Sequence, residues 1–385
     1  MPPPIYLDHA ATTPVRPEVV EAMAPFFGPR FGNPSSAHRW GREARTALDE
    51  ARERIARTLG ARVDEIVFTS CGTEADNLAL LGAWRAIRSE RPAIVTSPIE
   101  HKAVLAAAHR IAGEGGEERL VDVNEHGVVD RASYDAKVDA RTGVVSIMWV
   151  NNEIGVVQPI AELGAKSKEQ GAVFHTDAVQ AFGKIPIDVS KLPVDLLTIS
   201  GHKIGAPKGI AALFVRRGVR IEPMMHGGDQ DRGRRPGTEN VAFAVGLARA
   251  AELAVEEREA ECTRLAALRE QLESALLARI PDAIVHGRGA TRAPHILNIS
   301  VAGTDSESLL MALDLQGVAC SAGSACQTGN VSPSHVLKAM GVRPDIATSA
   351  IRMSLGSLTT PDNVTRVAEL FPALIQKARR LAGQT

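Results

Sequence analysis

Two predicted strands each lead directly to a side chain that could do chemistry. Residues 194–199 (Val-Asp-Leu-Leu-Thr-Ile) precede the segment 200–203 (Ser-Gly-His-Lys), and residues 172–174 (Ala-Val-Phe) lead within three residues to Asp177. An open α/β sheet presents its chemistry at the carboxyl ends of its strands. A lone lysine after a strand is typically a solvated surface charge. Lys203 and Asp177 together, however, are the pair that pyridoxal phosphate (PLP) requires: an amine for a Schiff base and an acid for the pyridinium nitrogen.

A third segment could hold a phosphate. Gly72 and Thr73 follow a predicted strand at 65–68 and open a helix, whose free N–H groups favour an anion. Threonine is also a common helix N-cap, so a plain capping role stays open. Neither Gly-x4-Gly-Lys-Ser/Thr nor Gly-x-Gly-x-x-Gly occurs, which argues against these two nucleotide-binding motifs.

His101 follows a predicted strand at 93–96. Its imidazole could stack on a flat cofactor and move protons, or it could be a solvated histidine at a helix start. A metal site is not predicted, because there is no His-Glu-x-x-His, and His101 and His109 are too far apart to share a metal on one helical turn. The four cysteines (Cys71, Cys262, Cys320 and Cys326) match no zinc spacing and are too few for a disulfide framework.

Cys326 lies in a small, polar, flexible segment, residues 321–330 (Ser-Ala-Gly-Ser-Ala-Cys-Gln-Thr-Gly-Asn). A buried structural cysteine has apolar neighbours, so this composition favours an exposed nucleophilic thiol. Cys320, after Gly317-Val318-Ala319, is instead expected on a strand and buried. Arg352 lies on an apolar predicted strand, where it needs a carboxylate partner. That carboxylate could belong to a substrate or to a structural salt bridge.

The bulk properties exclude several classes of protein. The chain has 385 residues, a formal net charge of −1 and 44% hydrophobic residues, which fits one large or two ordinary domains. A nucleic-acid binder would show a basic excess. No signal peptide is evident at the N-terminus, and the apolar stretch 241–255 contains charges that a membrane span would lack. We expect a reduced, cytoplasmic protein with no nucleic-acid or membrane partner.

The predicted elements would place these residues at one sheet edge. Strands are predicted at 65–68, 93–96, 144–150, 172–174, 194–199 and 211–215, and helices at 37–59 (capped by Ser35-Ser36), 102–112 and 160–170. This alternation predicts an α/β fold with a mostly parallel sheet. A helical pattern over 240–279 would bridge to a smaller α+β domain. The predicted domains are a large one, 16–258, and a small one made of 1–15 and 259–385.

Taken together, these residues closely resemble the cysteine desulfurases of the class V aminotransferase superfamily, in the branch that serves iron–sulfur cluster assembly. The likeness runs from residues 6–14 (Tyr-Leu-Asp-His-Ala-Ala-Thr-Thr-Pro) to 352–356 (Arg-Met-Ser-Leu-Gly). Its most specific segments are 150–155 (Val-Asn-Asn-Glu-Ile-Gly), 200–203 and 324–326 (Ser-Ala-Cys). The resemblance implies an aspartate-aminotransferase-like fold, a PLP cofactor, a homodimer and a sulfur-acceptor partner such as an iron–sulfur scaffold.

The resemblance also implies a role for each matching residue. Lys203 would hold PLP covalently, Asp177 would keep its ring nitrogen protonated, and His101 would stack on the ring. Cys326 would attack the sulfur of PLP-bound L-cysteine, leaving a persulfide and releasing L-alanine. Asn152 and Gln180 would contact the ring and its phenolic oxygen. The phosphate would be held by Gly72, Thr73, Ser200 and His202, with Thr238 from the partner subunit. The substrate carboxylate would be bound by Asn33 and Arg352.

Three departures from the family pattern concern the phosphate region. They are Asp229-Gln230-Asp231 in the glycine-rich loop, Pro236 where serine is common, and Cys71 in place of a usual glycine. They bear on the contact between subunits more than on the core chemistry.

Two other classes of function stay open on the sequence alone. One is an aminotransferase or selenocysteine-specific lyase of the same fold, and the other is a non-catalytic PLP-fold scaffold. Cys326 argues against a transaminase, which needs no thiol there, and Lys203 with Asp177 argues against a scaffold.

Overall fold

A seven-stranded sheet forms the centre of the larger part of the molecule. The structure is a computed structural model that describes residues 3–322 and 333–381. The strands of the sheet are β2 (Ile66–Thr69), β3 (Ala93–Thr96), β4 (Glu117–Leu120), β5 (Thr142–Ser146), β6 (Val173–Asp177), β7 (Leu196–Ser200) and β8 (Ala211–Val215). Their spatial order is β2-β8-β7-β6-β5-β3-β4.

The direction of the strands decides which strand ends, and so which side chains, meet at one edge of the sheet. β8 is antiparallel to both of its neighbours, β2 and β7, so those two run the same way. β7, β6, β5, β3 and β4 pair in parallel. Six strands therefore end at one edge of the sheet, and the predicted mostly parallel α/β fold is confirmed.

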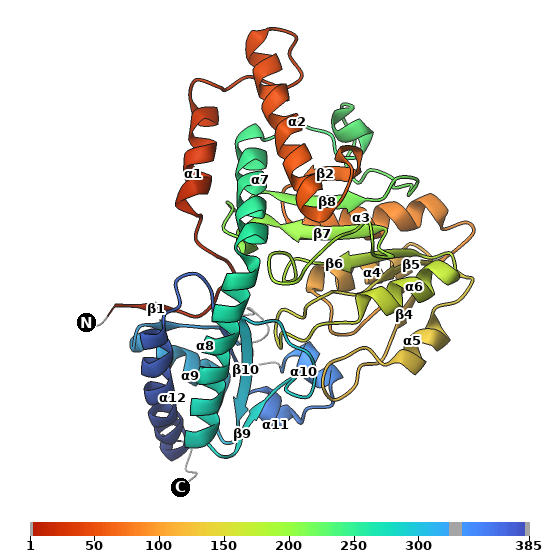
Figure 1. Cartoon of the computed structure of the whole chain (residues 1–385). Helices are drawn as coiled ribbons and strands as arrows, with labels where there is room; N and C mark the ends of the chain where they lie inside the picture. The colour runs from red at the N-terminus through yellow and green to blue at the C-terminus, as the bar shows by residue number, and fades with distance from the viewer. Residues whose placement is uncertain (1–2, 323–332, 382–385) are drawn as a thin grey trace.

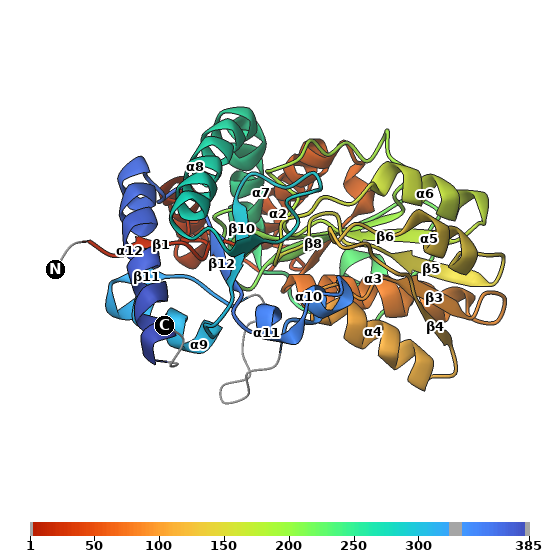
Figure 2. The same ribbon diagram turned by 90° about the horizontal axis from the view of Figure 1, so that it is seen from below.

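Helices cover both faces of this sheet (Figures 1 and 2). Because side chains alternate along a strand, Val144 and Leu196 pack on one face and Val145 and Leu197 on the other. The helices on the first face are α3 (Gly72–Ile87) and α4 (Lys102–Gly113). Those on the second face are α2 (Arg39–Leu59), α5 (Arg131–Lys137), α6 (Ile160–Glu169) and α7 (Val241–Glu256), with α1 (Pro17–Met23) and the 3-10 turn η1 (Ala24–Phe27) packed on α7.

The smaller part has its own antiparallel sheet and its own core. Its strands are β9 (Ala283–Val285), β10 (Ile296–Val301) and β12 (Ile351–Ser354), in the order β12-β10-β9, beside a parallel pair of β1 (Ile5–Tyr6) and β11 (Val318–Ala319). Its helices are α8 (Arg258–Arg279), α9 (Ser306–Leu315), α10 (His335–Ala339), α11 (Pro344–Ala347) and α12 (Pro361–Leu381).

The N-terminal residues Ile5 and Leu7 belong to the core of this smaller part, which lies at the lower left of Figure 1. The separate cores support the proposed division into 16–258 and 1–15 with 259–385, which stays a prediction.

The single helix predicted over 240–279 is two helices in the structure. α7 ends at Glu256 and α8 begins at Arg258, and the carboxylate of Glu257 between them accepts hydrogen bonds of 2.7 and 2.8 Å from Arg16. The break follows from packing, because α7 buries its apolar face in the large core and α8 in the small one.

Three local predictions also need correction. α2 begins at Arg39 with His38 as N-cap, whose Nδ1 accepts from the Gly41 amide at 3.2 Å, so Ser35-Ser36 do not cap it. Strand β5 ends at Ser146, because the Met148 amide turns to the carboxylate of Glu100. β4 was missed since this edge strand (Glu-Glu-Arg-Leu) is polar and has no buried residue. Within the described chain, every helix is too short or too polar to span a bilayer.

Candidate active site at the carboxyl edge of the sheet

A cavity of about 330 Å³ lies where the strands end. Its wall combines residues that follow five different strands with residues of the small part and the N-terminal segment. The lining includes Ala10, Ala11, Gly72, Thr73, Asp76, His101, Lys102, Asn152, Glu153, Asp177, Gln180, Ser200, His202, Lys203, His335 and Arg352. The structure therefore brings together ten of the side chains and glycines predicted for PLP and its substrate.

Lys203 closes the short turn η3 (Gly201–Lys203) directly after β7. Its Nζ donates hydrogen bonds to the carbonyls of Ala10 at 2.6 Å and Ala11 at 2.7 Å. Burial, aided by the positive charge of Arg352, lowers the pKa of the Lys203 amine to about 8. At pH 7 about one tenth of this amine is then neutral and nucleophilic, far more than for a solvated lysine.

Asp177 ends β6 and is almost fully buried. Burial raises the pKa of its carboxyl, and the charges of His101 and Lys203 oppose that rise. In the described chain, the hydrogen-bond donor to its side chain is the Val179 amide, at 2.9 Å. A protonated heteroaromatic nitrogen in the cavity would supply the cationic partner that this buried carboxylate needs.

The start of α3 forms the anion-binding corner of the cavity. Gly72 opens this 16-residue helix, and its N-cap Cys71 makes no side-chain cap. A Cβ on Gly72 would come within 3.3 Å of Val179 and 3.6 Å of Ser200, so glycine keeps the corner open. The Ser200 hydroxyl is buried without a hydrogen-bond partner among the described residues. A phosphate would satisfy both this hydroxyl and the free N–H groups of the helix, so the corner fits PLP.

Two histidines line the cavity, and a neighbouring amide fixes the tautomer of His101. His101 caps α4, because its Nδ1 accepts from the Ala103 amide at 3.2 Å, which leaves the proton on Nε2. Burial lowers the pKa of His101. Burial, followed by the charge of Lys203, lowers the pKa of His202 to about 4, and its Nδ1 lies 3.2 Å from Thr12 Oγ1. The His202 ring is therefore neutral at physiological pH.

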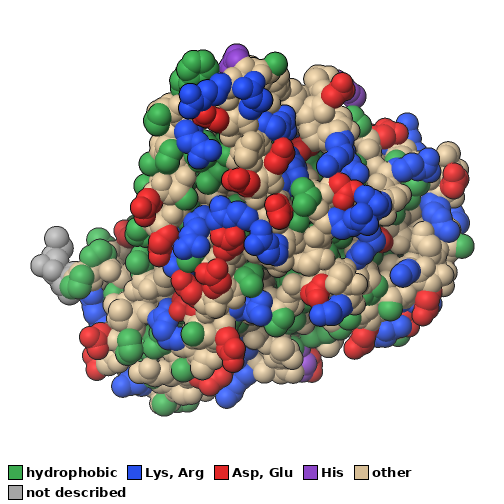
Figure 3. Space-filling view, turned by 45° about the horizontal axis from the view of Figure 1, so that its top comes forward, with side chains coloured by type: hydrophobic (Ala, Val, Ile, Leu, Met, Phe, Trp, Pro, Cys, Tyr) green, Lys and Arg blue, Asp and Glu red, His purple; other side chains and the backbone are tan. Residues whose placement is uncertain are grey.

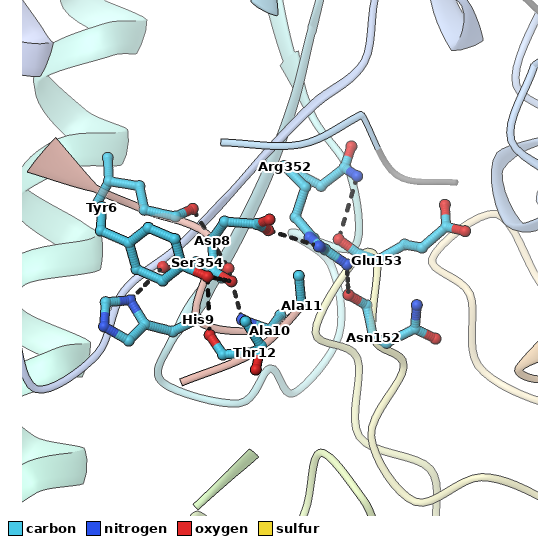
Figure 4. A network of polar contacts seen from close by, with 12 residues as sticks. Tyr6, Asp8, His9, Ala10, Ala11, Thr12, Asn152, Glu153, Arg352 and Ser354 are labelled. Atoms are coloured by element: carbon cyan, nitrogen blue, oxygen red, sulfur yellow. Dashed lines mark hydrogen bonds and ion pairs between the residues drawn. The ribbon is translucent and has the colours of Figure 1, made fainter. Parts of the chain in front are cut away.

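Arg352 on β12 reaches the cavity from the small part (Figure 4). Its Nη2 lies 2.8 Å from Asp8 Oδ1, and its Nη1 donates to the Asn152 carbonyl at 2.9 Å. Its Nε is buried without a hydrogen-bond partner in the described chain. The salt bridge considered in the sequence therefore exists, and it holds the guanidinium at the cavity wall, where a substrate carboxylate could add a further contact.

Two predicted residues lie away from this cavity within one chain. Asn33 is in the loop before α2, where its Oδ1 accepts from the Ser35 amide at 2.9 Å. Thr238 lines a separate hollow of about 210 Å³ with Ser70 and Arg235. Neither residue lines the cavity that contains Lys203, so the single chain does not bring them to the predicted site.

The unusual Asp231 of the glycine-rich loop has a structural role. It adopts a positive φ of 47° and forms an ion pair of 2.6 Å with buried Arg52, and its Oδ2 accepts from the Phe68 amide at 3.2 Å. This departure from the family pattern anchors the loop to β2.

The two cysteines singled out by the sequence differ in what the structure says of them. Cys326 lies outside the described residues. Cys320 follows β11 directly rather than lying within it, and it is partly buried beside the small core. Burial raises the pKa of its thiol to about 12, so the Cys320 thiolate is scarce at neutral pH.

The sequence missed several acidic and basic groups of the cavity wall and its support. Asp76 on α3 is buried, and burial together with repulsion from Asp177 raises its pKa well above the ordinary value. Burial raises the pKa of Glu100 to about 8. Glu100 and Glu153 stand beside His101 and Asn152 in motifs that were recognised, which could have drawn attention to them. Lys102, on the other side of His101, could have been noticed in the same way. His335 carried no signal, because only the fold brings it to the wall.

Comparison with known proteins places the chain in a family. The aminotransferase class-V model matches residues 5–367. The chain is 45% identical over 378 residues to a protein named cysteine desulfurase IscS from Dictyoglomus turgidum, covering 98% of this chain and 96% of the relative. It is 43% identical over 379 residues to cysteine desulfurase NifS from Azotobacter vinelandii, covering 98% and 94%.

The fold of this chain is also similar to that of solved structures. The fold matches a NifS-like protein with a TM-score of 0.91 and 37% identity, over 97% of this chain and 100% of that one. It also matches SspA in complex with cysteine with a TM-score of 0.80 and 34% identity, over 91% and 98%.

Proposed function

Because this chain belongs to the aminotransferase class-V family and is a PLP-dependent cysteine desulfurase, we propose that its cavity at the sheet edge is the desulfurase site and that Cys326 receives the sulfur. The observation that carries the proposal is the meeting of Lys203, Asp177 and the open start of α3 in one cavity. Bound PLP supplies an electron sink for the bonds at the substrate carbons.

The predicted residues of the cavity each have their own proposed role toward the cofactor or the substrate. Lys203 holds the cofactor covalently, and the carboxylate of Asp177 keeps a proton on the ring nitrogen. His101 covers the ring and moves a proton at its Nε2. Asn152 and Gln180 contact the ring and its phenolic oxygen. The phosphate is held by Gly72, Thr73, Ser200 and His202, with Thr238 of a second subunit, and the substrate carboxylate is bound by Arg352 and Asn33.

The product analysis tests this function directly. Purified protein with L-cysteine and a dithiol reductant is expected to give equal amounts of L-alanine and sulfide, because the dithiol reduces the persulfide. Without the reductant, the L-alanine formed in one turnover should match the persulfide on the peptide that contains Cys326. Formation of a keto acid with transfer of the amino group would instead indicate a transaminase, and turnover restricted to selenocysteine would indicate a lyase of that specificity. We propose a scaffold for iron–sulfur cluster assembly as the sulfur acceptor, and a cytoplasmic location in keeping with the few cysteines.

Arg352→Lys is expected to weaken the binding of L-cysteine by about 1–3 kcal/mol, because lysine keeps the charge but loses the planar fork that binds a carboxylate. Steady-state kinetics would show this as a raised KM. Arg292→Lys is the matched control: its buried guanidinium also forms a 2.7 Å ion pair, with Glu273, but lies outside the cavity. Unchanged KM and kcat in Arg352→Lys would mean that Arg352 only pairs with Asp8.

We propose that the active unit is a homodimer. Several large hydrophobic side chains are exposed between α1 and the start of α2: Val20, Phe27, Phe31 and Trp40. In Figure 3, hydrophobic side chains lie at the top and along the upper left edge, with Lys and Arg side chains beside them. The same region holds Asn33, which cannot serve its own cavity. A second copy would cover these side chains and bring Asn33 and Thr238 to a shared site.

Analytical ultracentrifugation at micromolar concentration is expected to give the mass of two chains. Trp40→Glu should weaken the dimer and reduce activity in parallel, because a buried charge opposes association. A monomer with full activity would contradict the proposal.

A further inference from the structure

The side chain of Gln180 lies between two cavities. It lines the cavity at the sheet edge and also a second one of about 510 Å³, whose wall includes His295 and Leu355 of the small part. Gln180 is buried, with 6% of its surface exposed. A buried amide needs hydrogen-bond partners for both its oxygen and its nitrogen.

The carbonyl of Ala10 fixes which end of this amide carries the nitrogen. A carbonyl can only accept a hydrogen bond, so the Gln180 atom that lies 2.9 Å from the Ala10 oxygen is Nε2. Ala10 is itself anchored, because its amide donates to Ser354 Oγ at 2.9 Å (Figure 4). The Gln180 nitrogen therefore keeps a second N–H that Ala10 does not use, and its oxygen needs a donor elsewhere.

His295, directly before β10, supplies that donor. Its Nε2 lies 3.3 Å from Gln180 Oε1, which can only accept, so Nε2 carries the ring proton. His295 is 3% exposed, and its Nδ1 has no hydrogen-bond partner in the described chain. Burial lowers the pKa of His295 well below its ordinary value, so the ring is neutral. The titratable groups around it also oppose its protonation: Lys184, His9, Arg352 and Arg269.

We propose that His295 is a positioning residue, which orients the Gln180 amide so that its free N–H is available to the phenolic oxygen of PLP. The role rests on the proposed contact between Gln180 and that oxygen. Without His295, Gln180 Oε1 would be a buried acceptor without this donor, which is unfavourable. The side chain would then turn toward other donors and offer its N–H to the cofactor for only part of the time. The small part thus contributes to the surroundings of the cofactor through His295.

His295→Leu in the PLP-loaded protein tests this role without any substrate. Leucine fills a similar volume but has no donor. A hydrogen bond donated to an oxygen lowers the affinity of that oxygen for a proton. Its loss should therefore raise the apparent pKa at which the visible absorbance of bound PLP changes, by about 0.5–1 for one neutral hydrogen bond.

Two further variants separate the donor from the bulk of the side chain. His295→Gln should return the apparent pKa toward that of the unaltered protein, because a glutamine amide can place an N–H near the position of Nε2. His286→Leu is the matched control and should leave the apparent pKa unchanged. His286 is also a buried histidine of the small part, its Nε2 lies 2.8 Å from Ser300 Oγ, and it lines neither cavity.

Gln180→Ala shows whether His295 acts through Gln180. This variant should raise the same apparent pKa, and adding His295→Leu to it should change nothing more, because residues that act through one contact have non-additive effects. A further rise in the double variant, as large as the rise in His295→Leu alone, would mean that His295 acts independently of Gln180 and would overturn the proposal.

An unchanged apparent pKa in His295→Leu, beside a raised one in Gln180→Ala, overturns the role of His295 and leaves the contact of Gln180 in place. Unchanged values in both variants remove that contact and the role of His295 with it. If His295→Leu does not fold or retain PLP, His295→Phe replaces it, since phenylalanine keeps a planar ring without a donor. The same rise is expected, and its absence overturns the proposal. Failure of the desulfurase function would appear instead in the assay of alanine and sulfide, which these spectra do not involve.

Discussion

Lys203→Ala is expected to abolish both turnover and the visible absorbance of bound PLP. The Lys203 amine is the proposed nucleophile. Burial lowers its pKa to about 8, and it lines the cavity together with Asp177 and the start of α3. When several catalytic residues act together, loss of one typically lowers the turnover rate by several orders of magnitude. We therefore expect kcat to fall by at least about 10³-fold. An absorbance spectrum and a sulfide assay of the purified variant measure the two losses.

Lys208→Ala is the matched control for this prediction, since Lys208 is an exposed lysine in the loop that follows η3. It should retain cofactor and turnover. Borohydride-reducible PLP on another lysine of the Lys203→Ala chain would disprove the assignment.

The unaltered protein allows a second test of the assignment of Lys203 as the amine that binds PLP. Only the neutral amine can attack an aldehyde. Because the pKa of Lys203 is lowered to about 8, the rate of PLP loading into apo-protein should rise as pH increases through about 8 and level off above it. A solvated lysine would need a pH about two units higher. A loading rate that does not change between pH 6 and 9 would contradict a role for this amine.

The sequence predicts the large domain well, because its buried strands have patterns that are hard to mistake. All five residues of β7 and of β8 are buried, and each run ends in turn-forming residues. The strand β4 was missed for the opposite reason, since it pairs only along one side and keeps polar side chains. The break at Glu257 could not be predicted, because helix propensity continues through it and only the two separate cores impose it.

The residues of the candidate site also divide into those that the sequence predicts and those that it does not. Lys203 and Asp177 are predictable because each stands at or just past the carboxyl end of a strand, and β6 and β7 are parallel neighbours in the sheet. His335 and Glu153 are not, because residues 182 positions apart meet only once the small part folds against the sheet edge. Asn33 and Thr238 cannot be placed from one chain at all, since their proposed partners lie in a second copy.

Cys326→Ala is expected to bind PLP and L-cysteine normally and yet release no sulfide. In the proposed function, the Cys326 thiol takes the sulfur and then gives it to an outside acceptor. Removing this covalent nucleophile would leave no atom to receive the sulfur. The spectrum should still change when L-cysteine is added, while alanine and sulfide production falls by at least about 10³-fold.

Cys320→Ala separates this thiol from its neighbour in the chain. Cys320 packs beside the small core, and burial raises its pKa to about 12, so it is a poor nucleophile at neutral pH. Its loss should leave the rate of sulfide release close to normal and cost only a modest part of the stability, since a small side chain is removed from a partly buried position. If Cys326→Ala kept producing alanine and sulfide while Cys320→Ala did not, the sulfur would pass through Cys320, and the mobility of its strand end rather than the polar segment around Cys326 would have to explain the transfer.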